Sequence, residues 1–306
     1  MAADTLQQHG RDCILLDKGR QSGGRMSTRH LDRTDPFSLC DHGAQYFTAR
    51  SDRFKQIVNE WLSVGIARVW TDGFMDDQGT SHFNGDPRYI GVDGMNGIPR
   101  YLTPQFNVHQ VRVTQIDQAD NQFVVQTEEG EWHGRHLLLT PPAEQSLTLI
   151  HSGNITLPIS AQNALRQIHF DPCFAVIAWL SAPSKIPAPG GLFMHNPEPI
   201  RWLADNQQKG ITPHPIVTIH AGAQFTRAHF EADRDEVAKM LIDAAAPYLG
   251  SSVIAHKVQR WKYSIPVQLH PERTLCIGDA NKIAFAGDAF GGARVEGAVL
   301  SGYCFG

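Results

Sequence analysis

Residues 14–25 read ILLDKGRQSGGR, and this stretch of the sequence decides the fold. An apolar run over 13–17, which we expect to form a short buried strand, ends in the acid Asp17. A short polar loop leads from it to Gly23 and Gly24. The second strand of a dinucleotide-binding βαβ unit ends in this way, because the acid holds ribose hydroxyls and the glycines let backbone N–H groups approach a pyrophosphate. The stretch therefore predicts an α/β fold with a dinucleotide site.

The sequence before Asp17 lacks the glycine-rich phosphate turn expected about 20 residues upstream of such an acid. Only sixteen residues precede Asp17, and residues 2–10 read as the end of a helix terminated by glycine. We therefore expect the first strand of the unit to be missing and two neighbouring strand edges to be unpaired. The closing helix, which ends soon after Ser301, is also short. Two explanations stay open: a sequence that begins at an internal methionine of a longer chain, or a shortened protein that binds its dinucleotide weakly or not at all.

Composition places the chain among ordinary globular proteins. Its 306 residues allow two domains, and 42% hydrophobic residues supply a core that needs no disulfide support. The net charge of −4 gives no electrostatic reason to expect nucleic acid or an anionic membrane as a partner. Five scattered cysteines without a C-x-x-C pair suit a reducing compartment, and the sequence shows neither a leader nor a membrane-length apolar run. We therefore expect a cytoplasmic protein.

Hydrophobic periodicity predicts the main elements outside the opening stretch. After the candidate N-cap Ser51, apolar residues recur at helical spacing until Gly65. Residues 106–140 predict a three-stranded meander whose third strand is 136–140. The other expected elements are strands at 174–180, 216–221 and 283–286, and helices at 233–248 and from Val295 onward.

The end of the chain carries a second dinucleotide-type pattern. Residues 287–302 read GDAFGGARVEGAVLSG, in which a strand leads into Gly287 and Asp288, a loop of small residues and a helix. The arrangement suits a flavin, because the aspartate can accept hydrogen bonds from ribityl hydroxyls and the helix N-terminus stabilises negative charge on the reduced ring. The alternative is an ordinary βα turn whose aspartate caps the helix.

Three blocks of sequence together resemble the renalase-like branch of the flavin amine-oxidase superfamily, whose members are NAD(P)/FAD-dependent oxidoreductases. The blocks are LLDKGRQSGGRMSTR at 15–29, DHGAQYFTAR at 41–50 and GARVEGAVLSG at 292–302. Looser matches lie between them, so the resemblance extends over nearly the whole chain. The first two blocks carry most of its specificity.

The resemblance implies an α/β fold with two domains. One is a truncated Rossmann-type FAD-binding domain, and the other is a mixed-sheet α+β substrate domain. The expected FAD-binding domain consists of 1–50, 106–143 and 270–306. The expected substrate domain consists of 51–105 and 144–269.

The resemblance also implies FAD as cofactor, with Asp17 at the adenosine ribose and Arg25 at the pyrophosphate. The positions implied at FAD are Asp17, Gly23, Gly24, Arg25, Ala44, Gln45, Gly91, Val113, Gly287, Asp288 and Val295. The positions implied at the substrate are Tyr46, Phe47, Thr48, Ala49, Arg50, His82, Phe83, Asn84, Cys173, His220, Trp261, Tyr263 and Arg294. For His220, Trp261 and Tyr263, ordinary core packing is the alternative.

The implied reaction is hydride transfer from an isomeric dihydronicotinamide of NAD(P) to flavin N5, followed by reoxidation with O₂ to give H₂O₂. No side chain is assigned a catalytic role, since the flavin carries the chemistry and the protein orients the donor. The sequence agrees, because it contains no G-x-S-x-G elbow, no H-E-x-x-H and no metal-spaced histidines. Arg50 and Arg294 could bind the anionic side of the substrate, or simply lie at the surface.

Two other functions stay open. One is a flavin amine oxidase acting on a small amine, in which Trp261 and Tyr263 line the flavin. The other is a non-catalytic remnant that cannot hold FAD. The lack of a phosphate turn favours the remnant, whereas the intact closing pattern at 287–302 argues against it.

Overall fold

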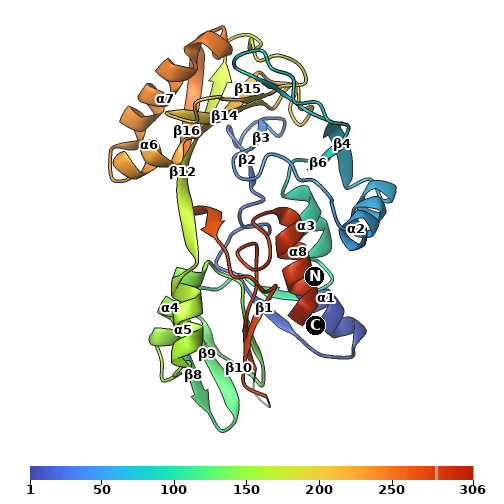
Figure 1. Cartoon of the computed structure of the whole chain (residues 1–306), viewed down its shortest axis with the longest axis vertical. Coiled ribbons are helices and arrows are strands. Elements are labelled where there is room, and N and C mark those ends of the chain that lie inside the picture. Colours follow the sequence, from blue (N-terminus) through green and yellow to red (C-terminus); the bar gives the residue numbers. More distant parts are fainter. Residues whose placement is uncertain (280–281, 306) are drawn as a thin grey trace. The chain divides into compact units, whose positions relative to one another are not determined.

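The computed structural model describes residues 1–279 and 282–305, and the chain forms two compact units (Figure 1). The first unit consists of Met1–Ser22, Leu102–Phe170 and the segment from Ile265 onward. The second unit consists of Gly23–Tyr101 and Asp171–Ser264. The chain therefore passes between the units four times, at 22/23, 101/102, 170/171 and 264/265.

Short strands in three separate sheets form the first unit. One sheet is the parallel pair β1 (Ile14–Leu16) and β7 (Asn107–His109). A second contains β11 (Leu137–Leu139), β18 (Ile283–Phe285) and β17 (Leu275–Ile277), with β11 and β18 parallel. The third is the antiparallel meander β8 (Val113–Ala119), β9 (Gln122–Thr127) and β10 (Gly130–Gly134).

The helices of the first unit close its core. They are α1 (Ala2–Gln8), α4 (Ala143–His151), α5 (Ile159–Arg166) and α8 (Val295–Phe305). Buried Ile150 of α4 and Leu165 of α5 share a cluster with Phe123 and Phe285. Removing this apolar surface from water stabilises the unit by roughly 25 cal/mol per Å². The other helices pack on each other, α1 against α8.

The structure corrects two predictions in the first unit. The tight turn at 129–130 lets the chain pair again at once, so β10 is the third meander strand. Residues 136–140, the expected third strand, instead supply β11, which pairs in parallel with β18. The strand predicted over 13–17 is confirmed as β1 but is not buried, since Ile14 is 47% exposed. Among the described strands, β1 pairs with β7 alone and β11 with β18 alone. The missing first strand stays a prediction.

A mixed six-stranded sheet is the centre of the second unit, with the order β16-β12-β15-β14-β13-β5. Its strands are β5 (Met75–Asp76), β12 (His169–Leu180), β13 (Gly191–Phe193), β14 (Ile200–Asp205), β15 (Ile216–Ala221) and β16 (Val253–Gln268). Helix α7 (Arg234–Leu249) packs on β14 and β15, with Val237 and Leu241 fully buried (Figure 1). The strands predicted at 174–180 and 216–221 and the helix at 233–248 are confirmed.

Smaller elements complete the second unit. They are β2 (Thr28–His30), β3 (Leu39–Asp41), α2 (Asp52–Ser63), β4 (Ala67–Thr71), β6 (Arg88–Gly91), α3 (Gly97–Leu102) and α6 (Ala223–Ala228). Helix α2 begins as predicted, because Ser51 Oγ accepts a hydrogen bond from the Phe54 N–H at 3.3 Å. No described helix is long and apolar enough to cross a membrane.

The boundaries of the units differ from those of the expected domains. Residues 23–50 lie in the second unit, because the β2–β3 hairpin packs against β15. Residues 144–170 lie in the first unit, where α4 packs against β8. The division into a cofactor domain and a substrate domain by function stays a prediction.

Candidate functional site

The acid that ends β1 is next to a pocket-lining residue of the first unit. The Asp17 N–H donates to the His109 carbonyl at 3.0 Å, so the ends of β1 and β7 meet. Lys18 and Arg112, the neighbours of Asp17 and Val113, line a surface pocket of about 500 Å³. The other lining residues are Gln110, Val111, Glu128 and Glu129. The neighbours of two predicted adenosine contacts thus surround one pocket of a size typical for small ligands.

The Gly-Gly-Arg turn lies in the second unit. Gly23 and Gly24 have φ angles of +119° and +52°, which favour glycine. A Cβ on Gly23 would lie 2.8 Å from the Met26 carbonyl oxygen, whereas no atom lies within 4 Å of the same position at Gly24. Arg25 donates from Nη1 to the Ser264 carbonyl at 3.2 Å. The backbone at Gly24 is therefore open to a ligand.

The closing loop of the first unit is held against its own helix. Gly287, at φ +140°, donates its N–H to Ser301 Oγ at 2.9 Å, and that hydroxyl donates to the Arg273 carbonyl at 2.5 Å. A Cβ on Gly297 would lie 2.1 Å from the Gly292 carbonyl oxygen, so only glycine allows the loop this close to α8. The sequence does not predict Ser301 as a loop anchor, although this residue lies in the closing block at 292–302.

Three predicted site residues surround the start of α8. Asp288 is half-buried, Arg294 is exposed just before the helix, and Val295 is the first helical residue. The first turn of a helix has free N–H groups and partial positive charge. This end of the first unit can therefore bind an electron-rich group.

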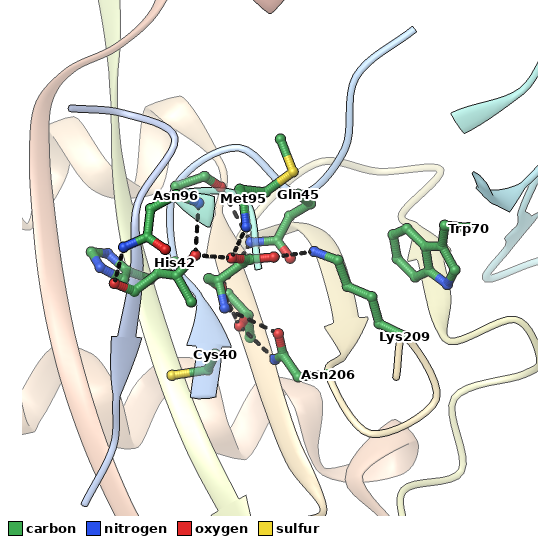
Figure 2. A network of polar contacts seen from close by, with 12 residues as sticks. Cys40, His42, Gln45, Trp70, Met95, Asn96, Asn206 and Lys209 are labelled. Carbon is green, nitrogen blue, oxygen red and sulfur yellow. Dashed lines mark hydrogen bonds and ion pairs between the residues drawn. The ribbon is translucent and has the colours of Figure 1, made fainter. Parts of the chain in front are cut away.

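Asp41, the last residue of β3, is the centre of a buried polar network in the second unit. Figure 2 shows the network, with Lys209, Asn206, Asn96 and Met95 labelled. Its Oδ1 accepts hydrogen bonds from Thr28 Oγ1 at 2.5 Å and from the Met95 N–H at 2.8 Å. Its Oδ2 accepts from Lys209 Nζ at 2.6 Å, and its own N–H donates to Asn206 Oδ1 at 3.1 Å. The network fixes the point at which the 41–50 block leaves the sheet.

Lys209 is the cation of this network and is fully buried. Burial lowers the pKa of the Lys209 ammonium, while the Asp41 carboxylate acts in the opposite direction. Its Nζ lies 5.1 Å from the centre of the Trp70 ring, a favourable cation–π distance. The sequence does not predict a site role for Lys209, because Asp41 and Lys209 are 168 residues apart in the chain and Lys209 follows a polar run typical of a loop.

His42 and Trp261 form a stack beside the network. Their ring centres are 5.5 Å apart at an interplanar angle of 17°. The His42 carbonyl accepts from Trp261 Nε1 at 2.9 Å and lies 3.4 Å from His220 Nε2. Burial lowers the pKa of His42 to about 3 and that of His220 to about 4, so both imidazoles are neutral at neutral pH. The structure thus brings together His220 and Trp261, both predicted at the substrate.

Gln45 and His42 each have a buried polar atom that no residue in the described part of the chain pairs with. Gln45 Nε2 donates to the carbonyls of Asp41 and Gly43, at 2.9 and 3.2 Å. Among the described residues, neither Gln45 Oε1 nor His42 Nδ1 has a hydrogen-bond partner. Ala44 is half-buried and donates its N–H to the Arg25 carbonyl at 2.8 Å. Buried polar groups are nearly always satisfied, so the two free atoms fit a ligand with complementary groups.

Tyr46 and Phe47 point into different aromatic clusters. Tyr46 packs with Trp70, Phe74 and Trp202, at centroid distances of 6.4, 5.3 and 5.9 Å. Phe47 is 3% exposed and packs in the core against Phe54 and other rings. Tyr46 is therefore nearer the Lys209 network than Phe47, which has a structural role.

Exposure separates the next predicted substrate residues. Thr48 and Ala49 are half-buried, whereas Arg50, His82, Phe83 and Asn84 are exposed. His82 Nε2 lies 3.0 Å from Asp76 Oδ2, and this hydrogen bond lowers the pKa of Asp76 to about 2. Asn84 Oδ1 accepts from Arg88 Nη1 at 2.7 Å.

Three other predicted site residues lie in the second unit and differ in burial. Cys173 of β12 is buried, and burial raises the pKa of its thiol to about 12. Gly91 is buried, and a Cβ there would lie 2.1 Å from the Gly94 carbonyl oxygen. Tyr263 is half-buried on β16. The Cys173 thiol is therefore uncharged at neutral pH, and Gly91 has no room for a side chain.

Comparison with known families identifies the chain. A family model described as flavin containing amine oxidoreductase matches residues 68–303, and a model described as an NAD(P)-binding Rossmann-like domain matches residues 1–61. The chain belongs to the flavin-containing amine oxidoreductase family. It is a flavin-dependent oxidoreductase whose cofactor is FAD, and the predicted fold class and cofactor are confirmed.

Solved structures share the fold of this family member at low sequence identity. A putrescine oxidase bound to putrescine has a TM-score of 0.72 and 14% identity, over 99% of this chain and 94% of the other. Cyclohexylamine oxidase from Brevibacterium oxydans IH-35A has a TM-score of 0.73 and 11% identity, over 99% and 94%. A fatty acid isomerase from P. acnes that produces CLA has a TM-score of 0.59 and 12% identity, over 87% and 83%.

Each of the two units of this flavoenzyme carries features that fit a part of FAD. Gly24 leaves open backbone of the kind that phosphates approach, and the pocket lined by Lys18 has the size for a nucleoside. Gln45 Oε1 and His42 Nδ1 are buried polar atoms that a heterocycle with N–H and carbonyl groups can satisfy. Among residues 1–279 and 282–305, no group of three His, Cys, Asp or Glu side chains is arranged for a metal ion.

Proposed function

We propose that this flavoenzyme is a renalase-like member of its family that oxidises an isomeric dihydronicotinamide dinucleotide. When bound, FAD supplies the hydride acceptor and is reoxidised by O₂ with formation of H₂O₂. Family membership supports the flavin chemistry. The three sequence blocks at 15–29, 41–50 and 292–302 support the renalase-like subtype.

One observation favours this substrate: the two imidazoles at the His42 carbonyl, those of His42 and His220, are poor proton acceptors. Burial is the main cause that lowers the pKa of His42 to about 3 and that of His220 to about 4. A dihydronicotinamide that loses a hydride becomes an aromatic pyridinium and releases no proton. An alkylammonium must lose a proton before it can donate a hydride. Imidazoles of such low pKa are weak bases for the proton of an alkylammonium, so the site suits the dihydronicotinamide better.

The proposed roles of the residues follow from these chemical groups. Asp17 and Val113 would contact adenosine, Gly24 and Arg25 the pyrophosphate, and Asp288 and Val295 the ribityl chain and pyrimidine edge. Ala44 and Gln45 would face the flavin ring. Tyr46, Trp261 and His220 would orient the nicotinamide by stacking and exclude water. The exposed Arg50 and Arg294 would bind substrate phosphates.

A flavin amine oxidase is the second candidate. Trp261 and Tyr263 are two residues apart on β16, so their side chains leave the same face of the strand. Two aromatic side chains of this kind can enclose a small amine. The shared fold of putrescine oxidase and cyclohexylamine oxidase also favours this candidate.

An anaerobic reduction experiment distinguishes the two candidates. The FAD-loaded protein is mixed separately with an isomeric dihydronicotinamide dinucleotide, with putrescine and with cyclohexylamine, and the flavin absorbance is followed. We expect bleaching with the dihydronicotinamide alone, and equimolar H₂O₂ after oxygen is admitted. Bleaching by the amines alone would establish the amine oxidase instead. A protein that stays colourless with excess FAD would contradict both.

A further inference from the structure

The amide group of Gln45 is fixed in one orientation. Its Nε2 donates to the carbonyl oxygens of Asp41 and Gly43, at 2.9 and 3.2 Å. Carbonyls only accept hydrogen bonds, so turning the amide round would place oxygen against oxygen. The Oε1 atom therefore points away from these partners, is buried, and accepts from no described residue. A buried acceptor left unpaired is destabilising, and a ligand N–H that pairs with it removes this cost.

The carbonyl that orients Gln45 belongs to Asp41, and Asp41 is bonded at every polar group. Its backbone N–H, its carbonyl and both carboxylate oxygens are occupied. The partners come from separate parts of the second unit and are Thr28, Met95, Asn206, Lys209 and Thr218. Figure 2 shows Lys209, Asn206 and Met95 approaching the network from different sides, with Gln45 beside it. Asp41 is thus a fixed point for the residues that follow it.

The Asp41–Lys209 ion pair lies at the end of β3, and both of its side chains are fully buried, at 0% exposure. Lys209 Nζ is 2.6 Å from Asp41 Oδ2. A buried ion pair usually contributes no more to stability than apolar residues of the same volume, because both charges lose their water. What such a pair does provide is one defined geometry. Stability alone therefore does not account for it.

We propose that the Asp41–Lys209 pair positions Gln45 so that its Oε1 accepts a hydrogen bond from an N–H group of a bound heterocycle. This proposal rests on the function proposed above and deepens it. Two ligands of the enzyme carry such an N–H: the isoalloxazine ring of FAD and the carboxamide of a nicotinamide. Gln45 touches the ligand, whereas Asp41 and Lys209 are positioning residues.

Ligand titrations of the full chain test the proposal. Gln45→Met removes the acceptor at nearly constant length, and Thr226→Val is the control, because Thr226 is buried and hydrogen-bonded in α6 of the same unit. FAD binding is measured by the visible spectrum and by quenching of flavin fluorescence. Nicotinamide and nicotinic acid, which lacks the amide N–H, are then titrated into the FAD-loaded protein.

We expect Gln45→Met to weaken the binding of one of the two ligands, FAD or nicotinamide, by about three- to tenfold, the range for one hydrogen bond. Weaker FAD binding with a shifted flavin spectrum identifies the flavin N–H as the donor. Unchanged FAD binding with loss of the preference for nicotinamide over nicotinic acid identifies the carboxamide. Thr226→Val should bind every ligand as the wild type does.

A double variant tests whether the Asp41–Lys209 pair positions Gln45. Asp41→Asn/Lys209→Met replaces the ion pair by neutral groups of similar size, so the second unit can fold without it. We expect it to reproduce the ligand defect of Gln45→Met, and a double variant with wild-type ligand binding would contradict the positioning role.

Ligand binding by Gln45→Met within twofold of the wild type would overturn the proposal, as would an equal loss in Thr226→Val. A wild-type protein that binds neither FAD nor nicotinamide would also overturn it. A protein that binds FAD but does not oxidise dihydronicotinamides would contradict the proposed substrate alone, because the Gln45 titrations need no turnover.

Discussion

The Lys209 ammonium is fully buried, so the folded protein depends on Asp41 to stabilise this charge. Lys209→Met would leave the Asp41 carboxylate buried and unpaired, and we expect the free energy of unfolding to fall by about 3–5 kcal/mol. The Asp41→Asn/Lys209→Met variant should recover most of this loss. Urea denaturation followed by circular dichroism measures both. Lys239→Met is the control, since its exposed pair with Asp243 should contribute about 0.5 kcal/mol or less.

His42 makes stability depend on pH. Burial lowers its pKa from 6.5 to about 3 in the folded protein, so protonation favours the unfolded chain. Its contribution is complete above pH 6.5 and is lost progressively as the pH falls toward 3. From about pH 7 to about pH 5 we expect a loss of about 2 kcal/mol. Thermal unfolding across this range should show a weaker pH dependence in His42→Phe, and an unchanged profile would contradict the assignment.

Gly43 shows where the chain has no room for a side chain. A Cβ there would lie 2.0 Å from the Arg25 carbonyl oxygen, and that oxygen belongs to the backbone. We expect Gly43→Ala to displace the 41–45 segment and to destabilise the protein by more than about 2 kcal/mol. Gly97→Ala is the matched control, since its Cβ would meet only Asp93 Cβ at 3.7 Å. In α3 the control should be neutral or stabilising by up to about 1 kcal/mol. Equal melting temperatures of the two variants would contradict the steric argument.

Helices with a capping side chain can be tested one element at a time. At the start of α7, Asp233 Oδ1 accepts from the N–H groups of Asp235 and Glu236, at 2.9 and 3.2 Å. Asp233→Ala should lower the free energy of unfolding by about 1 kcal/mol, because two N–H groups of the first turn lose their acceptor. Asp233→Asn keeps an acceptor and should change it little. A loss of equal size in both variants would point to charge rather than capping.

Elements with local signals were predictable, whereas pairing between distant strands was not. Ser51 marks α2, and the apolar spacing of Val237 and Leu241 marks α7, because both signals lie within a few turns of chain. Residues 136–140 also form a strand, but a sequence does not state which edge they join, and they pair with β18 rather than with β9. Strand existence follows from local preference, while partner choice depends on packing of the whole unit.

The same distinction applies to the site over the whole molecule. The sequence indicated the flavin and the block containing Gln45, because these motifs are local. It gave no sign of Lys209, which meets Asp41 across 168 residues of chain. Nor could a linear pattern show that Phe47 packs in an aromatic core while Tyr46, its neighbour, packs near Trp70. Long-range contacts of this kind are fixed only when the two segments of the second unit have folded together.

The packing of α1 against α8 has a consequence for biosynthesis. The ribosome synthesises α1 before α8, with the other described elements between them. Nascent α1 therefore lacks its packing partner until α8 has been translated. The contacts between the two helices can form only then, so this part of the first unit folds after residues 295–305 have been synthesised. Apolar segments that await a native partner during synthesis are open to aggregation.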